Sequence, residues 1–279
     1  MRRFALGLLL VLLTACGQQS GAPSSSLTVG AAADPESVLL ANVYAAALRS
    51  YGTAAQVEVL DDPFAGLDSG RVEVAPGLTG RLLQTFAPGG SGRTDEQAYR
   101  AMVAVLPEGV SAGDYATAAE DKPALAVSAK TATGWGGRTL AALVAHCPGL
   151  TVGAVKGSRP PAAVGDCALP APREFPDDAT LFDAVRAGRI TAAWTMTADP
   201  QVPAELVVLA DAKPALIPSE NVVPLYRRNE LTQQQVLALN QVAGVLDTAA
   251  IKRMRKDMAD GADPRTVAEA WLQENPLGR

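Results

Sequence analysis

The stretch "LDSGRVEVAPGLTGRLL", residues 67–83, carries the clearest signal of how this chain folds. Ser69-Gly70 favours a turn, Val72 and Val74 alternate with charged residues as in a strand, and a helix is expected from about Thr79. A strand that is followed at once by a helix is the repeating unit of α/β proteins. The stretch therefore predicts an α/β fold.

The rest of the chain repeats this alternation of short apolar strands and helices. Strands are expected at residues 27–32, 55–60, 124–129, 150–155, 190–196 and 204–211. Helices are expected at 36–51, 95–106 with Asp95 as cap, 138–146, 181–189, 232–245 with Thr232 or Asn229 as cap, 248–260, and from Asp263-Pro264 onward. Such an alternation predicts sheets of the parallel type. The Pro- and Gly-rich residues 157–176 predict a surface excursion.

The N-terminal residues have the pattern of an export signal. Arg2 and Arg3 precede an apolar run at 6–13. That run is too short for a membrane span, which takes about 20 apolar residues. Leu13-Thr14-Ala15-Cys16 resembles the lipobox of bacterial lipoproteins. The resemblance implies a signal peptide at 1–15, a lipid on Cys16, a flexible tether at 16–26 and attachment to the extracytoplasmic face of the cell membrane. An ordinary signal peptide with an incidental cysteine is the alternative.

The composition limits the kinds of partner. The chain has 279 residues, 48% of them hydrophobic, with 24 basic and 29 acidic side chains. Arg2 and Arg3 leave with the signal, so the mature chain holds 22 basic and 29 acidic residues, a formal charge of −7. Binding to nucleic acid is not expected, because it calls for a basic face. No second long apolar run suggests another membrane attachment.

Two cysteines, Cys147 and Cys167, remain after the signal is removed. Export would place them in a compartment where thiols oxidise. A disulfide between them would close a loop of about 20 residues and stabilise the protein by about 3 kcal/mol. Two separately buried thiols are the alternative. A metal site is not expected, because His146 is the only histidine and no CxxC pair exists.

Motifs of catalysis are missing from the sequence. "GGSGR" at 89–93 fails the Gly-x-Ser-x-Gly pattern at its last position, and "VGAVKGS" at 152–158 lacks the spacing of a phosphate-binding loop. The single histidine, His146, lies at the end of a short predicted helix, a position that more often serves helix capping or packing than catalysis. We therefore expect neither an enzyme nor a cofactor.

Five stretches, taken in order, resemble one protein family. They are "LTVGAAADPESVLLANVYAAALRSYG" (27–52), the opening stretch at 67–83, "LFDAVRAGRITAAWTMTADP" (181–200), "LIPSENVVPLYRRNEL" (216–231) and "DPRTVAEAWLQENPLG" (263–278). Their order and spacing are similar to those of the glycine betaine/choline/carnitine-type substrate-binding proteins of osmoprotectant ABC transporters. The resemblance runs from about Leu27 to Gly278.

The resemblance implies a type II periplasmic-binding-protein fold: two α/β lobes joined by two crossing strands, with a ligand cleft between them. Lobe one would hold residues 27–124 and 214–279 and lobe two residues 125–213, with a hinge near 122–127 and 211–217. The implied function is that of an extracytoplasmic solute-binding lipoprotein. It would act as a monomer that captures an osmoprotectant-like molecule and delivers it to an ABC permease. A lipoprotein sensor or partner-binding module with the same fold is the alternative.

The resemblance also implies a set of ligand-binding residues and a depleted aromatic cage. Rings attract a quaternary ammonium that cannot donate hydrogen bonds, yet Leu78 and Pro123 stand where the family has or often has rings, and none lies near Ser219-Glu220. We therefore expect a larger or less cationic solute than glycine betaine. The matched candidates are Asp34, Glu36, Leu78, Thr79, Arg81, Asp121, Trp194, Met196, Thr197, Glu220 and Asn221, with Asp199 as a further polar candidate. Arg81 would either clamp an oxyanion or carbonyl or lie on a solvent-facing helix surface.

Overall fold

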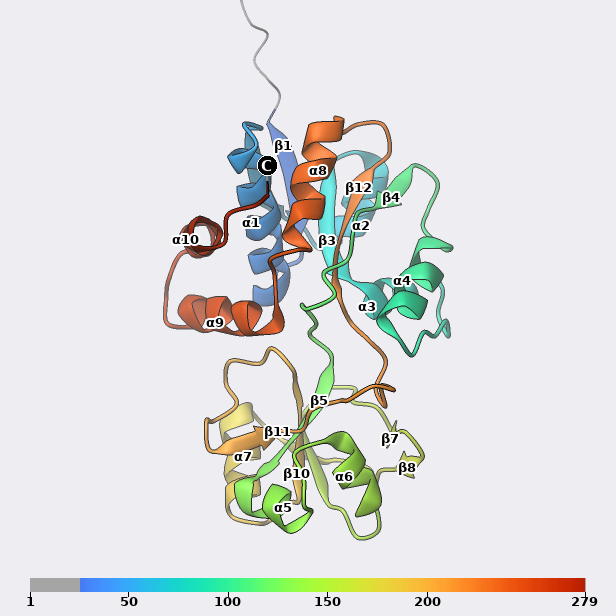
Figure 1. The fold of residues 1–279 in the computed structure, drawn as a ribbon, viewed down its shortest axis with the longest axis vertical. Helices are drawn as coiled ribbons and strands as arrows, with labels where there is room; N and C mark the ends of the chain where they lie inside the picture. The colour runs from blue at the N-terminus through green and yellow to red at the C-terminus, as the bar shows by residue number, and fades with distance from the viewer. Residues whose placement is uncertain (1–25, 279) are drawn as a thin grey trace, which may run out of the picture.

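The computed structural model describes residues 26–278, which form two α/β lobes, one above the other in Figure 1. Lobe one is built on a five-stranded sheet in the order β2-β1-β3-β12-β4. Its strands are β1 (Leu27–Ala31), β2 (Ala55–Val59), β3 (Val74–Leu78), β4 (Val110–Ala112) and β12 (Val222–Arg227).

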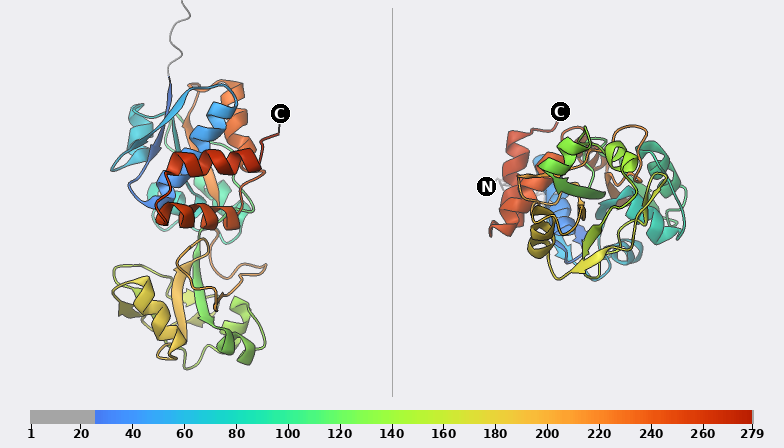
Figure 2. Two further views of the ribbon diagram at one scale, coloured as in Figure 1. Left: turned by 90° about the vertical axis from the view of Figure 1, so that its left-hand side faces the viewer. Right: turned by 90° about the horizontal axis from the view of Figure 1, so that it is seen from below.

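Helices cover both faces of the lobe-one sheet. They are α1 (Pro35–Ser50), α2 (Pro63–Ser69), α3 (Thr79–Phe86), α4 (Asp95–Val103), α8 (Gln233–Val242), α9 (Thr248–Ala259) and α10 (Pro264–Glu274). Helices α1, α8, α9 and α10 share one apolar core with the sheet, and α2, α3 and α4 belong to the core of the other face. Because α1 lies between the sheet and the C-terminal helices α8, α9 and α10, it is buried on almost every side (Figure 2).

Lobe two has a second five-stranded sheet, in the order β11-β5-β10-β6-β9. Its strands are β5 (Pro123–Ser128), β6 (Val152–Val155), β9 (Arg173–Phe175), β10 (Ala192–Met196) and β11 (Leu206–Val208). The helices α5 (Ala129–Gly134), α6 (Leu140–Ala145) and α7 (Asp178–Arg186) pack on it. The predicted excursion at 157–176 carries a small hairpin of β7 (Ala163–Val164) and β8 (Cys167–Ala168) and then β9.

Both sheets are mixed, so the prediction of parallel-type sheets was wrong for part of each. Strands β1, β2 and β3 are parallel, as are β6, β9 and β10. Strand β12 runs antiparallel to β3 and β4, and β5 runs antiparallel to β10 and β11. The reason is the route of the chain. Each of these strands enters its sheet from the other lobe, and thus from the opposite end to the strands that start within the lobe.

Caps were predicted for three helices, and two of these predictions are confirmed. The Thr232 hydroxyl accepts a hydrogen bond from the Gln235 amide at the start of α8, and Asp263 caps α10 with Pro264 in its first turn. The predicted cap of α4 was wrong by one residue. Thr94 is the cap and forms a capping box with Gln97. The Thr94 hydroxyl accepts from the backbone N–H of Gln97, and the side-chain oxygen of Gln97 accepts from the backbone N–H of Thr94. The short elements α2, β4 and α5 were not predicted.

Cys147 and Cys167 form a disulfide, with their Cα atoms 5.7 Å apart. The predicted pairing is therefore confirmed, and the alternative of two separate thiols is excluded. The bond ties the end of α6 to β8, and Cys167 is buried with the apolar side chain of Val164. It anchors the hairpin of the excursion to the core of lobe two.

Two chain segments connect the lobes, residues 113–122 between β4 and β5 and residues 209–221 between β11 and β12. They run alongside each other at Glu120 and Asn221, which form an antiparallel bridge, and the Asp121 amide donates to the Glu220 carbonyl at 3.0 Å. This is the arrangement of two crossing strands that the family resemblance implies. Among residues 26–278, no helix has the length and apolar composition of a membrane span.

Candidate ligand-binding cleft

The carboxyl ends of the parallel strands of both lobes lie at cavities, as expected for ligand sites in open α/β sheets. In lobe two, β6 and β10 end at Val155 and Met196, and both residues line a cleft of about 560 Å³. In lobe one, the ends of β1, β2 and β3 surround a second cavity of about 350 Å³, which Leu78 helps to line.

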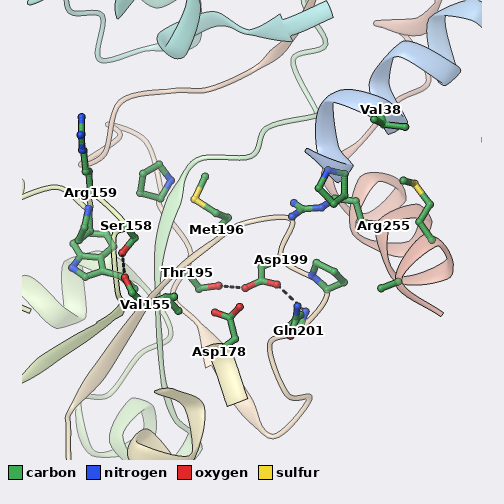
Figure 3. Close-up of a pocket in the computed structure, with 17 residues that line it drawn as sticks. Val38, Val155, Ser158, Arg159, Asp178, Thr195, Met196, Asp199, Gln201 and Arg255 are labelled. Atoms are coloured by element: carbon green, nitrogen blue, oxygen red, sulfur yellow. Dashed lines mark hydrogen bonds between the residues drawn. The ribbon is translucent and has the colours of Figure 1, made fainter. Parts of the chain in front are cut away.

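The larger cavity lies between the lobes and is called the interlobe cleft here. Lobe one contributes the first turns of α1 and the end of α9, and lobe two contributes the ends of β6 and β10, the start of α7 and the loop after β10 (Figure 3). Its lining comprises Pro35, Val38, Pro123, Val155, Ser158, Arg159, Pro160, Asp178, Trp194, Thr195, Met196, Asp199, Pro200, Gln201, Arg255, Met258 and Ala259. The wall is mainly apolar with a few charged groups, which is the usual make-up of a small-molecule site.

The smaller cavity, the lobe-one cavity, lies on the other side of the first turn of α1. Pro35 and Val38 face the interlobe cleft, whereas Asp34, Glu36 and Ser37 face the lobe-one cavity. The remaining lining is Ala32, Leu40, Asp61, Asp62, Pro63, Phe64, Pro76, Gly77, Leu78, Arg81, Leu82 and Thr85. The start of α1 therefore contributes to both cavities.

The predicted ligand-binding residues fall into three groups. Trp194 and Met196, with Asp199, line the interlobe cleft. Asp34, Glu36, Leu78 and Arg81 line the lobe-one cavity. Thr79, Asp121, Thr197, Glu220 and Asn221 are not among the lining residues of either cavity. The third group lies at or beside the crossing segments, where these side chains bind one another and the backbone.

Several of these polar groups already have partners within the protein. The Thr79 hydroxyl accepts from the Asn221 amide N–H at 3.1 Å, and the Asn221 side chain donates to the Ala116 carbonyl at 3.0 Å. The Thr197 hydroxyl donates to the Glu120 carbonyl and accepts from the Lys122 amide. Asp34 is the N-cap of α1 and accepts from the Ser37 amide.

Arg81 is held by acceptors from three parts of the chain. Its guanidinium is paired with Glu36, with Nη1 and Oε2 2.8 Å apart, and Nη2 lies 3.4 Å from the Asp121 carbonyl oxygen. The Arg81 backbone N–H donates to Glu220 Oε2 at 2.9 Å. The side chain is 49% exposed. Arg81 thus lies at the cavity wall, but Glu36 already binds one of the guanidinium nitrogens that a ligand would use.

Asp121 is the centre of a buried network at the crossing. The carboxylate is 1% exposed. Its Oδ2 lies 2.7 Å from Arg255 Nη1, and its Oδ1 accepts from the Ala198 amide at 2.8 Å. Arg255 Nη1 also donates to the Ala198 carbonyl. Asp121 therefore joins a crossing segment, helix α9 and the lobe-two loop that carries Asp199.

Lys122 and Asp211 form a second buried pair, between the two crossing segments. Their Nζ and Oδ2 atoms are 3.0 Å apart, and the side chains are 5% and 4% exposed. Glu120 lies 3.4 Å from the same ammonium. The Asp211 carboxylate also accepts from the backbone amides of Leu216 and Ile217. The pair holds the second crossing segment against the first.

The surroundings of three carboxyl groups raise their pKa values. Burial, and then the nearby Asp121 carboxylate, raise the pKa of Glu36 to about 8, against the opposing effect of Arg81. Burial also raises the pKa of Glu220, although Arg81 opposes this shift. The pKa of Asp178 is raised by burial and then by the charge of Asp199. Burial is the largest cause of all three shifts, and a neighbouring carboxylate adds to it at each site.

Arg255, Asp178 and Arg159 line the cleft but were not among the predicted residues. Each lies in a different segment, and none has a sequence pattern that marks a ligand contact. Asp178 follows the N-cap Asp177 of α7, so the local pattern favours a helix start. Arg255 lies on the amphipathic helix α9, where a charged residue usually faces solvent. Only the packing of the lobes brings these residues together.

Rings and metal ligands are scarce at the two cavities. Trp194 is the one aromatic residue among those that line the interlobe cleft, and Phe64 is the one that lines the lobe-one cavity. Tyr115 lines neither and packs on Tyr99, with ring centroids 4.7 Å apart. Over residues 26–278, no three side chains of the ligating types come close enough to hold a metal ion.

The fold matches known solute-binding proteins at low sequence identity. The apo form of YehZ from Escherichia coli shares 20% identity with a TM-score of 0.71, over 90% of this chain and 99% of that one. A structure described as a glycine betaine/carnitine/choline ABC transporter shares 16% identity with a TM-score of 0.73, over 90% and 98% of the two chains. A choline-binding protein of an ABC transporter, in complex with choline, shares 17% identity with a TM-score of 0.56, over 91% and 89%. These matches establish a common fold.

Sequence comparison gives the family. No curated protein sequence matches the chain. The model of the OpuAC family, described as the substrate binding domain of ABC-type glycine betaine transport systems, matches residues 25–274. With two α/β lobes, two crossing segments and a cleft between them, the chain belongs to the OpuAC family of ABC-transporter substrate-binding domains.

Proposed function

We propose that this protein is a lipid-anchored receptor that captures a solute larger than glycine betaine and delivers it to an ABC permease. The observation that carries the proposal is the interlobe cleft, which has walls from both lobes and a volume of about 560 Å³. That volume falls within the roughly 300–1,000 Å³ of pockets for drug-sized ligands. The predicted lobe bounds, 27–124 with 214–279 and 125–213, and the hinge near 122–127 and 211–217 are part of this proposal.

The scarcity of rings supports a solute other than glycine betaine. A trimethylammonium group is held by aromatic faces, each worth about 0.5 to 2 kcal/mol. Among the described residues, Trp194 is the single ring on the interlobe cleft, with Met196, Met258 and several prolines beside it. Leu78 lines the lobe-one cavity at a position where the family that the sequence resembles has a ring. These side chains make an apolar wall that fits a broader solute but attracts a cation weakly.

We expect glycine betaine to bind with a Kd above about 1 μM, which corresponds to a binding free energy weaker than about −8.2 kcal/mol. The reason is that one ring cannot surround a trimethylammonium group. Titration calorimetry measures this directly. Trp194→Leu should weaken whatever binding is found, and Trp135→Leu is the control, because Trp135 stacks on His146 and does not line the cleft. Sub-micromolar binding of glycine betaine by the unaltered protein would contradict the proposal.

The lipid anchor rests on Cys16, which lies outside the described residues, as do the predicted signal peptide and most of the tether. We expect Cys16→Ala to leave the protein unprocessed or to release it from membrane fractions. Partitioning of the mature chain into detergent phase, with mass spectrometry of its N-terminal peptide, measures this. A processed Cys16→Ala protein that still enters the detergent phase would exclude the anchor.

A further inference from the structure

Five charged side chains meet at the junction of the lobes and are called the crossing cluster here. They come from α1, α3, the two crossing segments and α9, and they are Glu36, Arg81, Asp121, Glu220 and Arg255. Arg81 contacts all three acidic residues, through Glu36 Oε2, the Asp121 carbonyl and the Glu220 carboxylate. Arg255 pairs with Asp121 from α9, the helix of lobe one that faces lobe two in Figure 1.

The crossing cluster has three carboxyl groups but only two guanidinium groups. The acidic side chains that share the lobe-one cavity with Glu36 add further negative charge, and they are Asp34, Asp61 and Asp62. Lys122 is already paired with Asp211 and Glu120. Glu36 and Asp121 are 7% and 1% exposed, so water cannot screen an unbalanced charge there. The charges of the cluster therefore balance only when one carboxyl group holds a proton.

Two of the three carboxyl groups have donors that stabilise their ionised form. Glu220 accepts a hydrogen bond from the backbone N–H of Arg81 at 2.9 Å. Asp121 accepts from the Ala198 amide at 2.8 Å and pairs with Arg255 at 2.7 Å. Hydrogen bonds and cations of this kind favour a carboxylate over a carboxylic acid.

Glu36 is the carboxyl group that remains to hold the proton. Its Oε2 is paired with Arg81, but its Oε1 is buried and accepts no hydrogen bond from residues 26–278. A protonated carboxyl group is a donor, so a proton on Oε1 removes the need for one. A hydrogen bond between the Glu36 and Asp121 side chains then has a donor on one side and an acceptor on the other.

We propose that Glu36 and Asp121 share one proton, and that loss of this proton at alkaline pH loosens the joint between the lobes. Ionised Glu36 repels the Asp121 carboxylate, which binds α9 through Arg255 and the lobe-two loop through Ala198. The inference goes beyond the proposed function, because it concerns how the lobes are joined and holds for any solute.

The direction of the pH dependence follows from the surroundings of Glu36. Burial, and then the charge of Asp121, raise the pKa of Glu36 from an ordinary value of 4.5 to about 8. The unfolded chain therefore loses this proton near pH 4.5 and the folded protein near pH 8. The stability that Glu36 contributes is complete below pH 4.5, declines as the pH rises and is lost above about pH 8.

The first test is urea denaturation of the unaltered protein and of Glu36→Gln from about pH 5.5 to about pH 7.5. Glutamine has the shape of the protonated acid but cannot ionise. Relative to the variant, the folding equilibrium constant of the unaltered protein is expected to fall about tenfold per pH unit, as for one proton lost on unfolding. Glu96→Gln is the control, because Glu96 is 62% exposed and pairs with Arg100. If Glu36→Gln and the unaltered protein have the same pH dependence, the inference is wrong.

Infrared difference spectroscopy of the folded protein tests the proton itself, because protonated and ionised carboxyl groups absorb at different frequencies. A carboxyl band that disappears with a midpoint near pH 8 is expected in the unaltered protein and in Glu96→Gln, but not in Glu36→Gln. If the unaltered protein has no such band, the shared proton is excluded, even where Glu36→Gln fails to fold.

Hydrogen–deuterium exchange tests the joint. The Ala198 amide, which donates to Asp121, is expected to exchange at least tenfold faster above pH 8 than at neutral pH, after correction for the chemical rate. In Glu36→Gln its corrected rate should stay constant. A corrected rate that is constant in the unaltered protein as well would show that the proton does not control the joint.

Discussion

Replacing Asp121 by alanine is expected to destabilise the protein by about 3 kcal/mol, the lower end of the range for breaking a buried ion pair. The carboxylate is 1% exposed and binds both Arg255 and the Ala198 amide. Its removal leaves a guanidinium and a backbone N–H without their partner. Arg255 is 19% exposed, so water reaches part of its charge and keeps the loss from being larger.

Urea denaturation, followed by circular dichroism, gives this change from the midpoint and slope of unfolding. Asp121→Asn is the informative second variant. Its amide keeps one acceptor oxygen for the Ala198 N–H but has no charge for Arg255, so we expect a smaller loss. Asp183→Ala, at an exposed position on α7, should change stability by less than about 0.5 kcal/mol. A loss below 1 kcal/mol for Asp121→Ala would show that the network at the crossing contributes little.

A second large effect is expected for Lys122→Met, again about 3 kcal/mol of lost stability. Lys122 and Asp211 are 5% and 4% exposed, so water cannot replace the ammonium as a partner of the carboxylate. The charge of Asp211 would be left in the interior with only the Leu216 and Ile217 amides to stabilise it. Methionine is similar in length to lysine, so the loss reports the charge more than the packing.

The double variant Lys122→Met with Asp211→Asn separates these contributions. Because the uncompensated charge is removed, we expect the double variant to regain about half of the stability that Lys122→Met loses. Recovery is incomplete, because the asparagine side chain can accept from only one of the two backbone amides. A double variant that is no more stable than Lys122→Met would mean that the lysine stabilises by packing, with no specific interaction with Asp211.

The helices and strands of the chain follow from local sequence. The apolar run of β1 and the helix that follows it were predicted within one residue at each end, because their apolar residues have the spacing of a strand and of a helix. Residues 67–83 likewise predict the strand through Val74 and the helix that begins at Thr79. Backbone propensity and capping act over a few residues, so a sequence pattern reports them well.

Strand direction was only partly predictable. The parallel pairing of β1 with β2 and β3 follows from the intervening helices, which return the chain to the same end of the sheet. The antiparallel placement of β12 and β5 depends on the chain crossing between lobes. The direction of a strand in a sheet is set by the entire route of the chain, so the composition of the strand does not predict it.

The candidate site shows the same division between what sequence and tertiary structure decide. The sequence by itself determined the α/β class, from the alternation of strands and helices. It favoured a pairing of Cys147 with Cys167, and its resemblance to a family supplied a set of polar candidates. Each of these depends on a local motif or on spacing along the chain. Only the tertiary structure decided which of these polar groups keep a free side for a ligand. Asp121 and Thr79 are occupied by partners up to 142 residues away, whereas Glu36 Oε1 and Asn221 Oδ1 accept no hydrogen bond from residues 26–278. Whether a buried polar atom is satisfied depends on every neighbour that packing brings to it, and those neighbours come from distant parts of the chain.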